Sequence, residues 1–204
     1  DQTYENPVVS TPRATVVADL DHDGDLDNAV SYPSSANVSV LENDGDGVYE
    51  TAVAFPLSGS PIFIAAADMD LDGNIDLVTA NQNREASILW NIGGNPIEFE
   101  PPARVDLEIE PRSLLVGDVN ADGREDIVVF EESGPTLVGA AGGRIAIVLN
   151  RGGRDYSAPS LLITGSGPRF GVVGDVDGDS DVDVISANRR SLDVTVFLSQ
   201  LSAS

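Results

Sequence analysis

One aspartate-rich nonapeptide appears four times in the chain, and its residue types are those that hold a hard metal ion. The copies, loops one to four, read DLDHDGDLD from Asp19, DMDLDGNID from Asp68, DVNADGRED from Asp118 and DVDGDSDVD from Asp175. Each places a carboxylate or amide oxygen at positions 1, 3, 5 and 9, and calcium prefers clustered oxygen ligands of this kind. Carboxylates packed this densely repel one another unless a cation compensates their charge. The pattern therefore predicts about one calcium ion per loop, up to four in the chain.

The predicted side-chain ligands are aspartates with a single asparagine among them. They are Asp19, Asp21, Asp23, Asp27, Asp68, Asp70, Asp72, Asp76, Asp118, Asn120, Asp122, Asp126, Asp175, Asp177, Asp179 and Asp183. Asn120 removes one charge from loop three, which should weaken that site modestly. In loop four Ser180 stands at position 6, where the other loops have glycine. This position should need a left-handed backbone, which serine adopts at a cost, so the sequence leaves the occupancy of loop four open.

The loops recur at a regular interval, and each lies between short apolar runs. Their first residues are 49, 50 and 57 positions apart, and a period near fifty is typical of repeat architectures. A run rich in β-branched residues precedes each loop, a second follows it and a third comes after that, which predicts three strands per repeat. The runs span 15–18, 26–30 and 38–41; 62–67, 75–79 and 87–90; 114–117, 126–129 and 145–149; and 170–174, 182–186 and 194–198.

In three repeats the third run ends in an asparagine, Asn43, Asn91 or Asn150, and a glycine-bearing turn follows it. A fourth strand is predicted after each of these turns. The aromatic residues that open it are Tyr49, Phe99 and Tyr156. Pro102 and Pro159 lie three residues after theirs, and a sheet tolerates proline only at an edge, so this strand should be outermost. The last repeat lacks such a strand, but TyrGluAsnPro at 4–7 matches TyrSerAlaPro at 156–159. We therefore expect the N-terminal strand to complete the last sheet and close a ring, as in β-propellers.

The predicted fold is an all-β, four-bladed β-propeller of four-stranded antiparallel blades. It forms one domain over 1–204, with blade repeats at approximately 11–57, 58–108, 109–164, and 165–204 together with 1–10. Because the outer strand of the last blade comes from the other end of the chain, two other outcomes are possible. The N-terminal strand could pair with the last blade of a neighbouring chain, giving a closed oligomer or a filament. The chain could also be a fragment of a longer propeller.

The unit of strand, DxDxDGxxD loop and DLVTAN-like strand resembles FG-GAP/VCBS repeats over essentially the whole chain. These repeats are the calcium-binding propeller blades of integrin α-subunit heads and of many secreted proteins, although familiar members have about seven blades. The resemblance implies structural calcium, bound by the side chains at positions 1, 3, 5 and 9 and by the backbone carbonyl at position 7. The position-7 residues are Asp25, Asn74, Arg124 and Asp181. An EF-hand is disfavoured, because position 12 is never acidic here.

The composition excludes several classes of function. The chain has 34 acidic and 11 basic residues, a net charge of −23, so it should repel nucleic acid and anionic lipid. No apolar run approaches the ~20 residues of a membrane span, so no membrane insertion is expected. The sequence has no cysteine nucleophile, and its single histidine, His22, lies within loop one. We therefore expect a protein without catalytic activity, and the acidic, lysine-free composition favours an extracellular or cell-surface location.

Arginines are concentrated on the opposite end of the predicted blades from the acidic loops. Arg13, Arg112 and Arg169 each follow a proline at the entrance of a first strand, and they form a candidate ligand face. They could pair with carboxylates between blades, or bind an anion or acidic ligand. The long segment 131–143 lies at the same end, either as a contact loop or as a tolerated insertion. Trp90 is expected to be buried rather than to stack on a sugar.

Two functions remain open from the sequence. One is a binding or adhesion module for a glycan or protein. The other is a structural protein that assembles with itself into a surface layer, tube or fibre.

Overall fold

The computed structural model describes residues 11–132 and 142–199, and the chain divides into two compact units, Asp1–Val105 and Asp106–Ser204. Apart from one 3-10 turn, η1 (Pro33–Ser35), every regular element of the described residues is a β-strand. The predicted all-β class is therefore confirmed. In this part of the chain no helix is long and apolar enough to cross a membrane.

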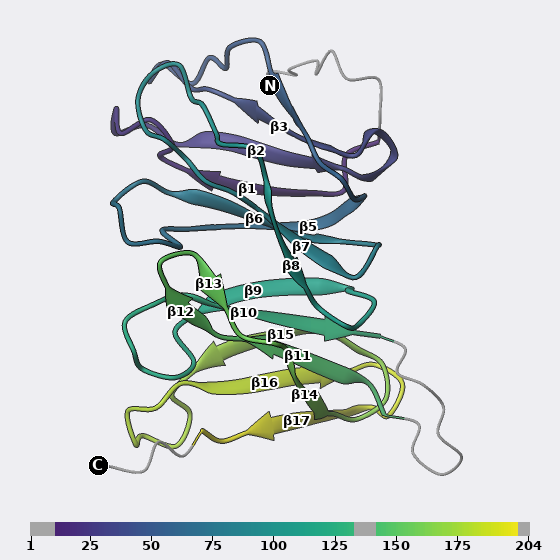
Figure 1. Ribbon diagram of the computed structural model, residues 1–204. Coiled ribbons are helices and arrows are strands. Elements are labelled where there is room, and N and C mark those ends of the chain that lie inside the picture. Colours follow the sequence, from purple (N-terminus) through teal and green to yellow (C-terminus); the bar gives the residue numbers. More distant parts are fainter. Residues whose placement is uncertain (1–10, 133–141, 200–204) are drawn as a thin grey trace. The chain divides into compact units, whose positions relative to one another are not determined.

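The first unit contains two four-stranded antiparallel sheets, which we call blades one and two (Figure 1). Blade one has the order β1 (Ala14–Ala18), β2 (Asp27–Tyr32), β3 (Asn37–Leu41) and β4 (Val53–Pro56). Blade two has the order β5 (Pro61–Ala67), β6 (Asp76–Asn81), β7 (Glu85–Leu89) and β8 (Ala103–Asp106). Loops one and two each connect the first strand of a blade to the second.

The second unit contains blades three and four. Blade three has the order β9 (Ser113–Gly117), β10 (Asp126–Glu131), β11 (Arg144–Val148) and β14 (Ser160–Ile163). A small hairpin of β12 (Asn150–Gly152) and β13 (Asp155–Tyr156) lies between its last two strands in sequence. Blade four has β15 (Pro168–Gly174), β16 (Asp183–Asn188) and β17 (Asp193–Phe197). All strand pairs are antiparallel, as a chain of hairpin connections requires.

The fourth strands of blades one to three lie at the edge of their sheets, as predicted, but they begin later in the sequence than expected. Tyr49 and Phe99 form isolated bridges to Asn43 and Asn91, several residues before β4 and β8 begin. Pro102 and Pro159 accordingly precede β8 and β14 instead of lying within them. A residue without an N–H fits the approach to an edge strand better than the ladder itself.

Two predictions fall on parts of the chain outside the described residues. The strand that should complete blade four was placed at 1–10, and most of the predicted long loop lies at 133–141. Within the described residues blade four has three strands. The division into blade repeats and the single closed domain therefore stay predictions.

Each unit has its own apolar core between its two sheets. In the first, Val38, Leu77 and Leu89 are fully buried, and Ile64 of blade two joins the same cluster. In the second, Phe130 and Ile145 of blade three pack with Val184 of blade four. Each fully buried side chain of this size contributes about 1.5–3 kcal/mol. The cores thus hold pairs of sheets face to face.

One glycine lets blades three and four approach closely. A Cβ added at Gly171 of β15 would lie 2.4 Å from the Phe130 ring and 2.2 Å from the Ile185 carbonyl oxygen. Backbone and ring cannot both move away in a close-packed core. Only glycine fits here.

Candidate metal centre

In three of the four loops, the first, third and ninth residues converge in space. In loops one, two and four, three carboxylates offer oxygens that all lie within 4.8 Å of one another. The groups are Asp19, Asp21 and Asp27; Asp68, Asp70 and Asp76; and Asp175, Asp177 and Asp183. In loop three, position 3 is Asn120, whose side chain ends in a neutral amide. The position-5 carboxylates and the position-7 residues, also predicted as ligands, are not members of these groups.

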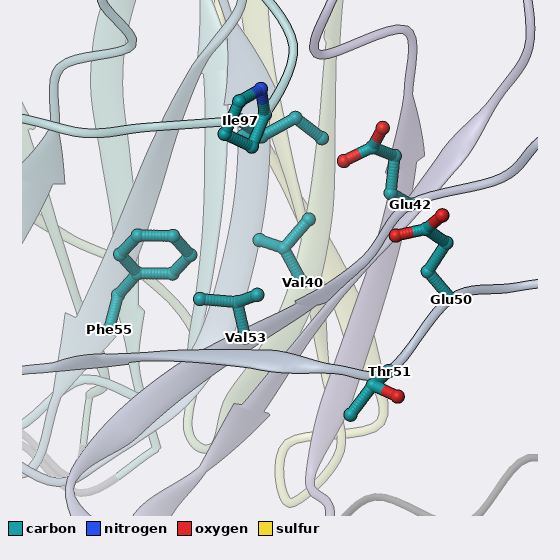
Figure 2. A pocket seen from close by; sticks show the side chains of 8 residues that line it. Val40, Glu42, Glu50, Thr51, Val53, Phe55 and Ile97 are labelled. Carbon is teal, nitrogen blue, oxygen red and sulfur yellow. The ribbon is translucent and has the colours of Figure 1, made fainter.

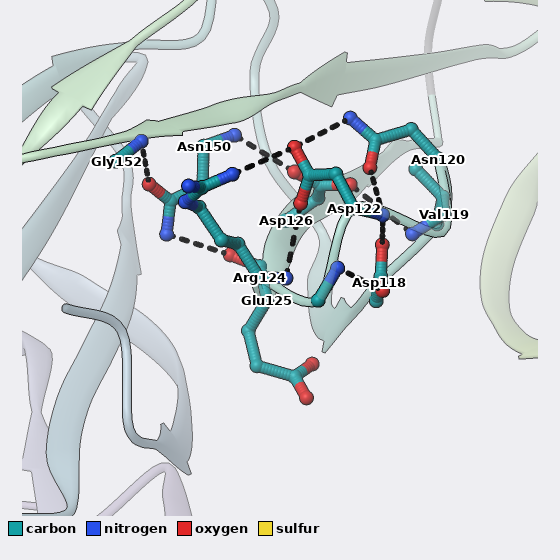
Figure 3. A network of polar contacts seen from close by, with 10 residues as sticks. Asp118, Val119, Asn120, Asp122, Arg124, Glu125, Asp126, Asn150 and Gly152 are labelled. Carbon is teal, nitrogen blue, oxygen red and sulfur yellow. Dashed lines mark hydrogen bonds and ion pairs between the residues drawn. The ribbon is translucent and has the colours of Figure 1, made fainter. Parts of the chain in front are cut away.

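Carboxylates shape the loop backbone by accepting its N–H groups. In loop two, Asp68 Oδ2 accepts from Gly73 N at 2.9 Å, Asp70 Oδ1 from Asp72 N at 3.2 Å, and Asp72 Oδ1 from Asn74 N at 2.8 Å. The corresponding bonds recur in the other three loops. Position 5 therefore has a definite role in the loop, which is to hold the amide of position 7. Figure 3 shows this arrangement in loop three.

Two positions of each loop adopt the left-handed backbone. Position 4 has φ of 65° at His22, 63° at Leu71 and 55° at Ala121, with Gly178 in loop four. At position 6, Ser180 has φ of 75° where the other loops have glycine. The predicted left-handed turn at Ser180 is thus confirmed. The left-handed backbone of the non-glycine residues at position 4 was not predicted.

The ninth residue is a buried clamp. In loop two, Asp76 Oδ2 accepts from Met69 N at 2.9 Å and Oδ1 from Asn91 N at 2.8 Å. The bonds therefore join the second residue of the loop to the end of the third strand. The same pair of bonds recurs in all four blades. The four carboxylates are Asp27, Asp76, Asp126 and Asp183, each at most 1% exposed.

An asparagine at the end of the third strand completes the clamp in three blades. Asn91 Nδ2 donates to the carbonyl of Ile75 at 3.0 Å, while its Oδ1 accepts from Gly93 N at 3.0 Å. Asn43 and Asn150 make the equivalent bonds, whereas Ser199 holds this place in blade four. Sequence reasoning used these asparagines only as turn markers. Their recurrence before each glycine turn was the signal for this second role.

Burial opposes ionisation of the clamp. It raises the pKa of Asp76 from 3.8 to about 7 and that of Asp126 to about 6, although two backbone N–H groups favour the charged form in each. Neighbouring loop carboxylates add to the increase. Burial also raises the pKa of Asp27. A bound cation would favour the ionised state of all three.

The donor set fits calcium. Every converging group is an oxygen, which suits a hard cation and not a thiolate- or imidazole-preferring metal. In loop one, Asp19 Oδ1 is buried and has no hydrogen-bond partner among the described residues. An ionised oxygen left in that state is costly unless a cation lies beside it. Positions 1, 3 and 9 are thus the residues best placed to hold the ion.

Loop three carries its own cation. Arg124 Nη1 lies 3.3 Å from Asp122 Oδ2, and the guanidinium packs over Gly152 of the adjoining hairpin (Figure 3). A Cβ at Gly152 would lie 2.8 Å from Arg124 Nε. Together with Asn120, this arginine makes loop three the least negative of the four.

Two of the three arginines predicted as a ligand face lie together in the second unit. Arg112 and Arg169 share one carboxylate, since their Nε atoms lie 3.2 and 3.6 Å from Glu132 Oε2. Arg13 lies in the first unit, where its backbone N donates to the Ser31 carbonyl at 2.9 Å. Trp90 is 3% exposed, as predicted.

A small hollow on the first unit was not predicted. Apolar side chains line one side of it, and two carboxylates lie on the other (Figure 2). The lining residues are Val40, Glu42, Glu50, Thr51, Val53, Phe55, Pro96 and Ile97. Burial, with the nearby carboxylates of Asp21 and Glu50, raises the pKa of Glu42. Such a hollow suits an apolar group with a cationic end.

The chain was compared with solved structures, with curated proteins and with models of protein families. A solved structure of BBS1N in complex with ARL6DN, soaked with lead, has a TM-score of 0.47 and 10% identity, covering 99% of this chain and 67% of that chain. The same complex soaked with mercury has a TM-score of 0.43 and 12% identity, covering 97% and 68%. Among curated proteins there is no significant match. The FG-GAP-like repeat model matches residues 19–79 and 68–129, which is more than half of the sequence. The chain belongs to the FG-GAP-like repeat family.

Proposed function

We propose that this protein is a calcium-stabilised β-propeller that binds a partner without catalysing a reaction. The observation that supports it most is the convergence of three carboxylates in a loop that backbone hydrogen bonds hold in one shape. Calcium bound there would neutralise the carboxylates and stabilise the turn between the first two strands of a blade. The ion would be structural.

The proposed ligand is a glycan or a protein outside the cell or at its surface. Rigid antiparallel blades leave their connecting loops at the ends of the sheets, where loops on a fixed scaffold make contacts. The net charge of −23 argues against nucleic acid and anionic membranes as partners. Calcium sites of modest affinity, with Kd of about 10⁻⁴–10⁻³ M, are typical of extracellular modules.

Calcium titration by calorimetry, combined with thermal unfolding, tests the proposal. Binding in the millimolar range or tighter, with a melting temperature that falls in chelator, is the expected result. Magnesium serves as the control ion, since its smaller, stricter coordination shell should bind these loops more weakly. A melting curve that chelator leaves unchanged would reject structural calcium.

Blade four supports a second candidate function, self-assembly. Its outer strand β17 pairs with β16 only, within the part of the chain that the structure describes. Val194 and Val196 on this strand are 61% and 47% exposed. Unpaired edges of this kind accept a further strand, from the same chain or from a neighbour.

Light scattering in calcium and in chelator separates the two functions. A stable species of about 21 kDa would favour the binding module with a strand of its own on β17. A calcium-dependent dimer or larger assembly would favour self-assembly.

A further inference from the structure

Four arginines of the second unit surround one carboxylate. Glu132 Oε2 lies 3.2 Å from Arg112 Nε and 3.6 Å from Arg169 Nε. Glu132 Oε1 lies 3.9 Å from Arg189 Nη1 and 3.8 Å from Arg190 Nη2. Blade three contributes the glutamate after β10 and Arg112 before β9, and blade four contributes the other three arginines. We call these five residues the arginine cluster.

The cluster is not a balanced ion pair. Four guanidinium groups face one carboxylate, so the cluster has a net charge of +3 within a chain of net charge −23. The neighbouring pair in the same blade differs: Glu131 accepts from Arg144 Nε at 2.5 Å and Nη2 at 3.0 Å, one acid for one base. At the cluster, six repulsive arginine pairs accompany four attractive contacts. A second anion would relieve that imbalance.

The guanidinium groups are accessible and have donors to offer. The side chains of Arg169, Arg189 and Arg190 are 44%, 65% and 56% exposed, whereas that of Glu132 is 19% exposed. No side-chain hydrogen bond of the four arginines occurs among the described residues. Each guanidinium has five N–H donors in a fork that matches two oxygens of one anion.

The backbone that carries the arginines is fixed. Arg189 N donates to Gly167 O and Arg190 N to Ser166 O, both at 2.9 Å. The Arg190 side chain packs over Gly167, where an added Cβ would lie 2.8 Å from Arg190 Cγ. Ser113 Oγ donates to the Arg169 carbonyl at 2.8 Å and so joins the two blades. A prepared cationic surface binds with a smaller entropic cost than a mobile one.

We propose that the arginine cluster binds one compact oxyanion group, a sulfate, phosphate or carboxylate, on a small molecule or an otherwise neutral sugar. The ligand is compact because the large negative charge of the whole protein repels an extended polyanion. Glu132 holds the arginines together when the anion is absent and competes with it when it binds. This inference specifies the ligand of the proposed binding module and rests on that function.

Sulfate titration by calorimetry, in calcium and at constant ionic strength, tests the site. The double variant Arg189→Gln/Arg190→Gln should bind sulfate at least about tenfold more weakly, because charge-assisted bonds to guanidinium are the strong class. Arg151→Gln removes an exposed arginine of the same unit outside the cluster and is the matched control. Equal sulfate affinity in the double variant and the control would overturn the proposal.

Glu132→Gln provides the opposite test. Removing the competing charge should tighten sulfate binding and make the gain in melting temperature per millimolar sulfate larger than in the unaltered protein. Unchanged or weaker binding in a variant that remains folded would contradict the proposal.

A monosaccharide with and without its sulfate distinguishes the two ligand sources. Tighter binding of the sulfated sugar than of free sulfate indicates a sugar ligand, and equal binding indicates a small anion. Tighter binding of the neutral sugar would reject an oxyanion site. The melting temperature in chelator, measured on the same samples, tests separately whether calcium stabilises the protein.

Discussion

Loops two and three have the same shape and different charge. In both, the first carboxylate accepts from the position-6 amide, at 2.9 Å in loop two and 2.8 Å in loop three. In both, the carboxylate at position 9 accepts a hydrogen bond from the backbone N–H of an asparagine, at 2.8 Å from Asn91 and 2.7 Å from Asn150. Loop two, however, has three converging carboxylates, whereas loop three has the neutral amide of Asn120 at position 3 and the guanidinium of Arg124 beside Asp122.

The comparison separates two roles that the motif combines. Hydrogen bonds between carboxylates and backbone amides determine the shape of the loop, whereas the number of charges determines how strongly it can hold a cation. A loop can therefore keep its shape while its affinity for the ion changes. Substitutions can therefore act on one role at a time.

The largest effect should come from the buried clamp. Asp76→Ala and Asp126→Ala should each lower the free energy of unfolding by about 3 kcal/mol or more in chelator, because each variant leaves two backbone N–H groups without their acceptor. The two losses should be similar, since the clamp is the same in both loops. Denaturant unfolding measures them. A nearly neutral Asp126→Ala would show that the clamp in loop three is not structural.

Calcium removal should affect the first unit clearly. At about 10 mM calcium, a site with Kd of about 10⁻³–10⁻⁴ M adds about 1.4–2.7 kcal/mol. The single tryptophan, Trp90, is buried in the first unit, so its fluorescence reports loops one and two. Circular dichroism reports both units. A shift in chelator that is smaller by fluorescence than by circular dichroism would contradict the expected advantage of loop two over loop three.

Exchanging the differing residues should exchange the affinities. Asn120→Asp with Arg124→Asn should tighten calcium binding at loop three about tenfold, since a change of one or two charges near the ion is worth about 1 kcal/mol or more. Asp70→Asn with Asn74→Arg should weaken loop two by a similar factor. Calorimetric titration measures both pairs. Unchanged calcium affinities in both double variants would mean that the number of charges does not determine the difference in affinity between loops two and three.

The calcium-free protein should become less stable as the pH rises. The pH range of this loss should be wider for Asp76 of loop two than for Asp126 of loop three. Folded Asp76 has a pKa of about 7 against an ordinary 3.8, so between these values the folded state binds more protons than the unfolded state. For Asp126 the window ends at about 6. Asp76→Asn should therefore flatten the stability profile up to pH 7, and Asp126→Asn only up to pH 6. The difference is at most about 1.4 kcal/mol. Identical profiles for the two variants would contradict the assignment.

The smallest effect should come from loop four. Ser180→Gly should stabilise the protein by about 0.5–1 kcal/mol, because Ser180 is held at φ of 75° and glycine adopts that region freely. Ser180→Ala retains the strain and is the control. Thermal unfolding measures both. A gain in the alanine variant equal to that of glycine would mean that backbone strain is not the cause.

The strands and the loops were predictable because both have a local cause. Short runs rich in β-branched residues define strands such as β6 and β10, and oxygens at fixed spacing define the loops. The clamp was not predictable in the same way, since Asp76 was read only as a ligand and Asn91 only as a turn residue. Their bond depends on the register between β6 and β7, which brings Asn91 beside Asp76, and the types of the two residues do not reveal that register. The arginine cluster was predicted in part for a similar reason: proline–arginine pairs marked Arg112 and Arg169, but no pattern pointed to Glu132 between them.

Two hydrogen bonds in the first unit bear on how a repeat protein gains and loses copies. Asn91 Nδ2 of blade two donates to the Leu20 carbonyl of loop one at 2.7 Å, and Asn95 Nδ2 donates to Asp21 Oδ2 at 3.1 Å. Blade two therefore carries the side chains that finish the loop of its predecessor. A gene duplication that copies blade two as a whole brings those side chains with it, and the joint with the preceding loop is complete at once. A deletion that ends within blade two leaves the preceding loop unsupported. Viable changes in length should therefore come in whole repeats, with breakpoints that keep this asparagine pair beside the loop it completes.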